Sequence, residues 1–348
     1  MNVKLPSISI IIATYNSERT LRECLDSLKK QDYHKKNIEL IIADGGSTDK
    51  TLTIAKLFNC YIVKIPTHKQ NAEYNKGVGL THAKNKLVLF IDHDNVLPHN
   101  QWLRNMVEPL LQHKNVVAVE PLRYHYSKKY NLLDRYFALF GVNDPVPYYL
   151  GKADRMDYIH EGYNLLGYII HLGSEQISTP DVRSNKYYIV EFDQKHPQRI
   201  PTLGANGFLI RRKLLLKAKS GPEYFFHIDV NVDLVKQGFT KYAFIKDSII
   251  HKTNNRLIPF LSRRLQFIDE YYWQRIKYRR YNVYLSEDKW KLIMYVFLSL
   301  TFIKPAIDSI RGYFKIHDLA WFLHPFMCFV FTCIYGYGFL HKKLPYEN

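Results

Sequence analysis

The sequence contains little cysteine and lacks the glycine motifs of common nucleotide-binding folds. Its four cysteines, Cys24, Cys60, Cys328 and Cys333, show none of the spacings of a zinc site, so we interpret them as reduced packing residues in a reducing compartment. Neither G-x-G-x-x-G nor G-x-x-x-x-G-K-[ST] occurs, which disfavours the dinucleotide-binding and P-loop folds that depend on those glycines.

Acidic residues are scarce relative to basic ones. The 348 residues include 49 Lys and Arg against 32 Asp and Glu, a formal net charge of +17. This excess predicts an anionic partner: nucleic acid, a phosphorylated substrate or an anionic lipid surface. No nucleic-acid recognition motif accompanies the charge, so we do not expect nucleic acid as the partner. Residues 1–6 lack the pattern of a signal peptide, from which we expect catalysis on the cytoplasmic side.

Apolar runs alternate with helix-forming segments over the first hundred residues. The predicted strands are Ser7–Ala13, Ile38–Ala43, Cys60–Ile65 and Leu87–Ile91. The predicted helices between them are Glu18–Lys30, Thr51–Phe58 and Asn71–Ala83. This alternation predicts an α/β protein built on a doubly wound parallel sheet.

Polar side chains follow three of these strands. Tyr15 and Asn16 follow the first strand, residues 44–49 the second, and Asp92-His93-Asp94 the fourth. The carboxyl ends of parallel strands meet at one edge of the sheet, where open α/β sheets bind ligands. Two aspartates one residue apart can hold a divalent cation and the phosphate oxygens that it bridges, although a polar turn has the same composition.

Three segments, residues 11–16, 43–49 and 90–94, together resemble the N-terminal signatures of inverting family 2 glycosyltransferases with the GT-A fold. The resemblance implies a mixed, mostly parallel sheet with helices on both faces. It also implies a nucleotide-sugar donor (UDP-, GDP- or dTDP-linked) and Mg²⁺ or Mn²⁺ as cofactor. Two departures are Gly45, where many relatives carry a second aspartate, and Tyr74, where many carry an arginine.

The resemblance also implies roles for individual residues. Tyr15 is expected against the nucleobase, Asp44 in contact with the base, and Asp92 at the ribose. The full donor-binding set is Thr14, Tyr15, Asn16, Asp44, Gly46, Asn75, Asp92 and His93. The expected metal ligands are Asp94, Asp92 and His251.

The segment Phe226–Leu234 resembles the family segment that carries the catalytic base. When the two are aligned on Asp233-Leu234, the usual base position falls on Asn231, which cannot take up a proton. Asp229 is the first candidate for the base and Asp233 the second. Alternatively, the acceptor is already anionic, as a lipid phosphate is, and needs no strong base. The residues expected near the acceptor or a phosphate are Asn206, Gly207, Asn231, Arg263 and Arg264.

The C-terminal part changes composition. Residues 252–291 interleave basic and aromatic side chains, a pattern typical of amphipathic helices at membrane surfaces. Two apolar segments follow, 292–303 and 319–340, and basic residues flank both, so topology cannot be assigned. We predict membrane association through 292–348 and leave open whether these helices span the membrane or lie on it.

The predicted domains are therefore a GT-A catalytic domain, 1–251, with a nucleotide-sugar half (1–100) and an acceptor half (101–251), then 252–291 and 292–348. The expected function is metal-dependent, inverting transfer of a sugar to a membrane-held acceptor in glycan or cell envelope biosynthesis. The acceptor is expected to be a polyisoprenyl phosphate or a lipid-linked glycan, and the location the cell membrane, with the catalytic domain facing the cytoplasm. The alternative is a non-catalytic nucleotide-sugar or lipid-binding scaffold, which Asn231 in the base position favours.

Overall fold

The computed structural model describes residues 5–153, 155–160, 177–178, 186–253, 256–268, 278–282 and 284–343. The chain forms two compact units. Unit 1 combines Met1–His125 with Ser174–Thr253, and unit 2 combines Tyr126–Gly173 with Asn254–Asn348. This division differs from the predicted domain limits, because the segment after His125 groups with the C-terminal helices. Part of the predicted basic region, residues 269–277, lies outside the described residues.

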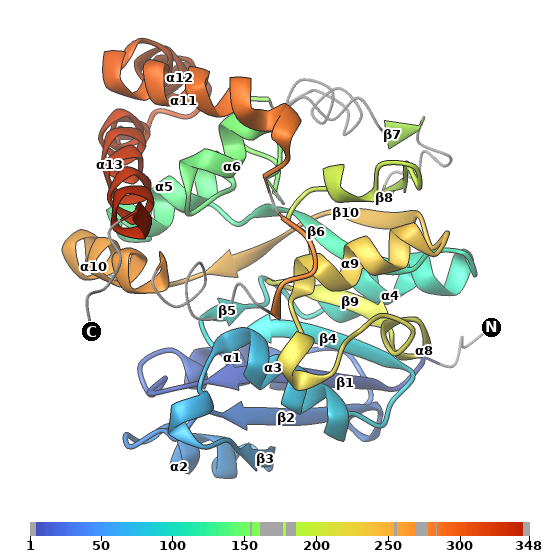
Figure 1. Cartoon of the computed structure of the whole chain (residues 1–348). Helices are drawn as coiled ribbons and strands as arrows, with labels where there is room; N and C mark the ends of the chain where they lie inside the picture. Colours follow the sequence, from blue (N-terminus) through green and yellow to red (C-terminus); the bar gives the residue numbers. More distant parts are fainter. Residues whose placement is uncertain are drawn as a thin grey trace. The chain divides into compact units, whose positions relative to one another are not determined.

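The first half of the sheet in unit 1 is parallel, as the alternation predicted. Strands β1 (Ile8–Thr14), β2 (Ile38–Asp44), β3 (Tyr61–Lys64) and β4 (Leu87–Asp92) lie in the order β3-β2-β1-β4 (Figure 1). Every residue of β1 is buried, which explains its continuous run of isoleucine and small residues.

The second half of the sheet is mixed. Strand β9 (Phe208–Arg211) lies between β4 and β6 (Ala118–Tyr124) and is antiparallel to both. Strand β10 (Lys241–His251) continues the sheet parallel to β6. The remaining strands are β5 (Asn95–Val96), β7 (Ile177–Ser178) and β8 (Tyr187–Phe192). The predicted α/β class with a mixed sheet is confirmed.

Helices pack on this sheet. Helix α3 (Ala72–His82) lies against β1 and β2, and Gly79 permits the close approach, since a Cβ there would be 2.5 Å from Ile11 Cγ2. The other helices of unit 1 are α1 (Leu21–Lys29), α2 (Thr51–Leu57), α4 (Trp102–Gln112), α8 (Arg212–Leu215) and α9 (His227–Lys236), and its short 3₁₀ helices are η1 (Lys35–Asn37), η2 (Thr67–Lys69), η3 (Pro197–Arg199) and η4 (Pro222–Tyr224).

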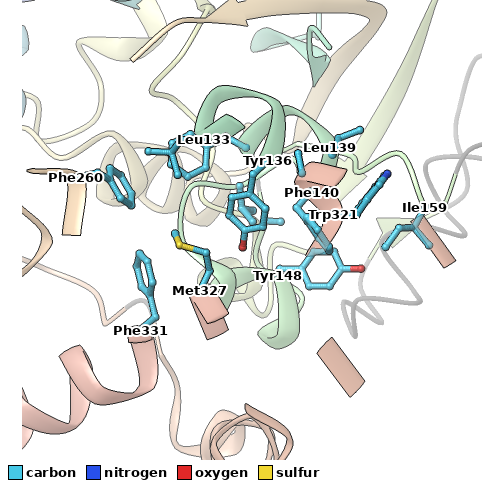
Figure 2. Packing of buried hydrophobic residues seen from close by; sticks show 14 residues of the cluster. Leu133, Tyr136, Leu139, Phe140, Tyr148, Ile159, Phe260, Trp321, Met327 and Phe331 are labelled. Atoms are coloured by element: carbon cyan, nitrogen blue, oxygen red, sulfur yellow. The ribbon is translucent and has the colours of Figure 1, made fainter. Parts of the chain in front are cut away.

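Unit 2 is helical and has an aromatic core. Figure 2 shows Tyr136 and Phe140 gathered with Tyr148, Trp321 and Met327. The ring centroids of Phe140 and Trp321 are 4.8 Å apart in an edge-to-face arrangement. The helices of this unit are α5 (Leu132–Phe140), α6 (Pro145–Leu150), α10 (Leu257–Ile268), α11 (Lys289–Thr301), α12 (Ile303–Lys315) and α13 (His324–Lys343), with η7 (Ser286–Asp288) and η8 (Leu319–Leu323).

The helices α11, α12 and α13 carry many exposed apolar side chains. In the described part of the chain, one helical stretch, Leu319–Gly338, is long and apolar enough to cross a membrane. A second is obtained if the pair of residues 286–301 and 303–315 counts as one span, but this pair bends by 76°. Exposed large apolar side chains on these helices include Trp290, Ile293, Phe297, Leu300, Ile303, Ile307, Ile310, Phe314, Phe326 and Tyr337.

Candidate active site

The loops after β1 and β2 are joined by the carboxylate of Asp44. This side chain is 1% exposed. Its Oδ1 accepts hydrogen bonds from Thr14 Oγ1 (2.9 Å) and Ser47 Oγ, and its Oδ2 from the backbone N–H groups of Gly46 (3.0 Å) and Ser47 (2.9 Å). Asp44 therefore organises the loop after β2, since its two carboxylate oxygens already accept four hydrogen bonds from the protein. The predicted contact of Asp44 with a nucleobase stays a prediction.

The two glycines of this loop occupy positions that a larger residue cannot fill. Gly46 has φ +90°, and a Cβ there would lie 2.4 Å from Thr67 Oγ1. A Cβ at Gly45 would lie 2.2 Å from Gln70 Cγ. The side chain of Gln70 thus fills the space of the aspartate that many relatives carry at Gly45.

Tyr15 and Asn16 lie at the same edge of the sheet. The Tyr15 side chain is 42% exposed, so a ring face is available for stacking on a base. Asn16 has φ 48°, and its Oδ1 accepts a hydrogen bond from Thr48 N at 2.9 Å. The β1 loop is therefore fixed to the β2 loop while the aromatic side chain next to it remains accessible.

Asp92 forms an ion pair that the sequence analysis did not identify. Lys76 Nζ lies 2.7 Å from Asp92 Oδ1, and the Lys76 side chain is 2% exposed. Burial lowers the pKa of this lysine, but the carboxylates of Asp92 and Glu73 outweigh burial and raise it. Lys76 therefore stays charged and holds one of the two predicted aspartates. Neighbouring His93 places its Nδ1 2.7 Å from Thr20 Oγ1.

Asp94 faces His251. The antiparallel pairing of β5 with β10 sets His251 opposite Asn95, and the distance from His251 Nε2 to Asp94 Oδ2 is 3.4 Å. The His251 ring stacks on Tyr124, with centroids 5.3 Å apart. Burial raises the pKa of Asp94, but His251 and His93 outweigh it and lower the pKa to about 2. Asp94 is therefore ionised at neutral pH.

The chemistry of Asp94 and His251 fits a divalent cation in a site that also uses substrate phosphates. Mg²⁺ and Mn²⁺ accept carboxylate oxygen, and Mg²⁺ sites of this kind use one or two carboxylates plus phosphates and water. Within the described ranges, no three His, Cys, Asp or Glu side chains lie close enough to hold a metal together. Asp92, the third predicted ligand, is directed to Lys76 instead.

Helix α9 carries the base candidates. Asn231 is fully buried: its Nδ2 donates to Leu203 O (3.0 Å) and His227 O (2.9 Å), and its Oδ1 accepts from Tyr242 Oη (3.0 Å). Asn231 therefore has a structural role in joining α9 to β10. Asp229 is also fully buried. The Oδ2 of Asp233 accepts the backbone N–H of Lys219 at 3.1 Å.

The remaining predicted residues divide between the units. Gly207 N donates to Phe90 O at 2.9 Å, which fixes the Asn206–Gly207 segment beside the end of β4. Arg263 and Arg264 belong to unit 2, where the guanidinium of Arg264 lies over aromatic rings. Asn75, on α3, is 1% exposed, and its Nδ2 would lie 3.0 Å from a Cβ at Gly45.

Three charged or titratable residues around this edge were not predicted from the sequence: Lys76, Glu73 and His227. His227 Nδ1 lies 2.6 Å from Glu73 Oε1, and its backbone N–H donates to Glu73 Oε2 at 2.9 Å. The spacing of Glu73 and Lys76, three residues apart on a predicted helix, was a signal that both lie on one helix face.

Comparison with known proteins identifies the family of this chain. Residues 9–171 match the model of glycosyl transferase family 2. This part of the chain belongs to that family. The matched residues include the loops after β1, β2 and β4. We call the edge of the sheet that carries these loops the donor edge, because the nucleotide-sugar donor is expected there. The family is the one that the three N-terminal motifs resembled, so that prediction is confirmed.

Relatives match about a third of this chain. Glycosyltransferase AglE of Haloferax volcanii is 30% identical over 114 residues, which is 32% of this chain and 37% of the relative. A Methanococcus voltae protein, dolichyl N-acetyl-alpha-D-glucosaminyl phosphate 3-beta-D-2,3-diacetamido-2,3-dideoxy-beta-D-glucuronosyltransferase, is 37% identical over 108 residues, 29% of this chain and 33% of the relative. The chain thus covers about a third of the length of each relative.

A solved structure is similar over nearly the whole chain. Mannosyltransferase PcManGT from Pyrobaculum calidifontis, in complex with GDP-Man and Mn2+, has a TM-score of 0.53. It is 15% identical in sequence, and the match covers 98% of this chain and 89% of that one. At this identity, the similarity shows a shared fold.

Proposed function

We propose that this chain is a metal-dependent inverting glycosyltransferase that moves a sugar from a nucleotide-sugar to a membrane-held acceptor. The observation that carries the proposal is the donor edge of unit 1. There, Asp94 and His251 approach within 3.4 Å, beside the accessible Tyr15 and the loop that Asp44 organises. The relatives and the GDP-Man and Mn2+ complex of the Pyrobaculum enzyme support this reading.

In this proposal, Asp94 and His251 would hold Mg²⁺ or Mn²⁺. A divalent cation supplies Lewis-acid stabilisation of the charge that develops on a leaving diphosphate. Tyr15 stacks on the base of a UDP-, GDP- or dTDP-sugar, and Lys76 fixes Asp92 near the ribose. The acceptor oxygen attacks the anomeric carbon from the face opposite the diphosphate, which inverts the configuration.

The acceptor class is proposed from unit 2 and from one relative. The exposed apolar faces of α11, α12 and α13, near basic residues such as Lys289 and Arg311, suit an anionic membrane surface. The name of the Methanococcus relative describes transfer to a dolichyl phosphate-linked sugar. We therefore favour a polyisoprenyl phosphate or a lipid-linked glycan, with unit 1 facing the cytoplasm.

The test is a donor screen with the purified 348-residue chain. UDP-, GDP- and dTDP-sugars are offered with Mn²⁺, Mg²⁺ or a chelator, and with either membrane lipid extract or soluble sugars. We expect one donor to release its nucleoside diphosphate in a metal-dependent reaction and to label the lipid phase. Asp94→Asn should lower this rate by about 100-fold or more.

The matched control is Asp247→Asn, because Asp247 also pairs with a histidine, His99, at 2.8 Å on the exposed surface of unit 1. It should retain the wild-type rate. Donor binding without turnover would favour the scaffold alternative. Transfer to soluble sugars with none to lipid would exclude the lipid acceptor but not the glycosyltransferase activity.

A further inference from the structure

Two of the three residues considered for the base position on helix α9 are inaccessible. Asp229 and Asn231 are both fully buried, and the bonds of Asn231 are within the protein. The Oδ2 atom of Asp233 accepts a hydrogen bond from the backbone N–H of Lys219. A general base must reach the proton that it abstracts, directly or through one water molecule. Neither buried side chain offers that access in this structure.

His227 lies one helical turn before Asn231 on the same face of α9, and its side chain is 20% exposed. It is therefore accessible where Asn231 is not. The backbone of Gly204 lies directly against both residues, because a Cβ on Gly204 would be 2.8 Å from His227 Cβ and 2.9 Å from Asn231 Nδ2. Gly204 is three residues from Gly207, which bonds to the end of β4.

A chain of charged groups connects His227 to the donor edge. His227 Nδ1 is 2.6 Å from Glu73 Oε1 on α3. Lys76, one turn further along α3, is influenced by the charges of both Glu73 and Asp92 and lies 2.7 Å from the latter. The close approach of α3 and the segment before α9 is possible because Gly77 has no side chain: a Cβ there would be 2.7 Å from Phe225 Cβ.

The Glu73 contact determines which ring nitrogen can accept a proton. Burial raises the pKa of Glu73, but His227 and Lys76 outweigh it and lower the pKa to about 2. Glu73 is therefore ionised at neutral pH and can only accept hydrogen bonds. Nδ1 of His227 must donate, so in the neutral ring the lone pair is on Nε2. In the described part of the chain, Nε2 has no hydrogen-bond partner.

We propose that His227 is the general base of the transfer reaction and that Glu73 is its positioning residue. The inference rests on the proposed function and specifies an acceptor hydroxyl, as on a lipid-linked glycan. The hydroxyl proton passes to Nε2 while the acceptor oxygen bonds to the anomeric carbon. The bond from that carbon to the diphosphate breaks, and its electron pair leaves with the nucleoside diphosphate. The Glu73 carboxylate stabilises the resulting imidazolium, as the carboxylate of a catalytic triad does.

A purely structural role, an ion pair that joins α9 to α3, predicts different behaviour on substitution. His227→Ala removes the ring but keeps the backbone bond to Glu73 Oε2, so the helix connection persists. His227→Asn also keeps a side-chain hydrogen-bond donor for Glu73, but asparagine cannot take up a proton from the acceptor. Glu73→Gln keeps the shape of Glu73 and removes its charge. The control is His99→Ala, which breaks a surface histidine–aspartate pair of the same kind.

The experiment measures kcat, donor Kd and the pH profile of kcat/KM for the purified chain with donor and lipid-linked acceptor. We expect His227→Ala and His227→Asn to lower kcat by about 100-fold or more, with donor Kd within about twofold of wild type. The acid limb of the profile should disappear, and added imidazole should restore part of the rate of His227→Ala. Glu73→Gln should lower kcat by about tenfold.

The pH profile is assigned through the variants because other titratable groups surround His227. The charged groups on its own helix are Asp229, Asp233 and Lys236. The elements packed beside it add Glu73, Lys76, Glu120, Arg199, Arg212, Lys213 and Glu223. If His227→Ala and His227→Asn retain wild-type kcat and the acid limb, the inference is overturned and the proposed function stands. If the wild-type chain transfers no sugar to any acceptor, both are overturned.

Discussion

Lys76 is the residue on which the geometry of Asp92 depends. Its ammonium is buried, and the nearest carboxylate oxygen, Asp92 Oδ1, lies 2.7 Å away. A buried charge is stable only with a partner, so each member of the pair keeps the other in place. The last residue of β4, Asp92, is thus held by a lysine, and Asp94, in the turn that follows, is held by His251.

Replacing Lys76 with methionine should damage both stability and donor binding. The change leaves Asp92 without its cation. Because the Asp92 side chain is 29% exposed, water compensates in part, and we expect a loss of about 2 kcal/mol in the free energy of unfolding. Urea denaturation measures this loss, and calorimetric titration with the nucleotide-sugar should show weaker binding. Lys56→Met, on the exposed face of α2, should change neither. Wild-type stability of Lys76→Met would contradict the role given to the pair.

At the scale of elements, unit 2 depends on a close contact between α12 and η8. Gly312 lies beneath the ring of Trp321, and a Cβ on this glycine would be 2.3 Å from Trp321 Cδ2. Trp321 is fully buried and donates its indole N–H to Ile316 O at 3.0 Å. Neither the ring nor the helix backbone has space to move without disturbing the aromatic core in Figure 2.

Gly312→Ala should therefore destabilise unit 2 by about 1–3 kcal/mol through overpacking. The matched variant is Gly336→Ala in α13, where a Cβ meets nothing within 4 Å. In a helix interior, that change should stabilise by up to about 1 kcal/mol, since alanine has the higher helix propensity. Thermal or urea unfolding monitored by tryptophan fluorescence distinguishes the two. Equal effects of both variants would contradict the contact with Trp321.

At the scale of the whole molecule, the net charge of +17 and the exposed apolar faces of α11 and α12 would both act on the anionic membrane surface proposed above. Anionic vesicles attract the charge over the distance set by ionic strength, and buried apolar side chains hold the protein once it is bound. Binding should therefore weaken, but not vanish, when salt is raised, whereas a nucleic-acid-binding protein should lose its partner steeply.

Substituting three exposed side chains should separate the contribution of apolar burial from that of electrostatic attraction. Phe297, Ile303 and Phe314 are each more than half exposed, and changing all three to serine removes about 1.5 kcal/mol or more of apolar contact per residue. We expect vesicle affinity in a flotation assay to fall by about 100-fold or more. Leu57→Ser, at an equally exposed apolar site of unit 1, should leave it unchanged. Undiminished vesicle binding by the triple variant would exclude α11 and α12 as the part of the protein that binds the membrane.

The sequence by itself determined the parallel half of the sheet and the family. Strands β1 and β4 are almost entirely buried apolar runs, and β2 is buried from Ile41 to Asp44. The polar ends of these parallel strands must meet at one edge of the sheet. Local composition is sufficient for these strands, and the same reasoning predicted Asp92, Asp94 and Tyr15 as a group. The family followed from the resemblance of three segments, residues 11–16, 43–49 and 90–94, to its N-terminal signatures, and the comparison confirmed it.

Only the tertiary structure decided which of these side chains interact. The antiparallel β9 between β4 and β6, and the pairing of β5 with β10, bring His251 to Asp94 across more than 150 residues of chain. His227 meets Glu73 for the same kind of reason. Such contacts depend on strand order and on glycines that let elements approach, and neither is encoded in the periodicity of a single segment.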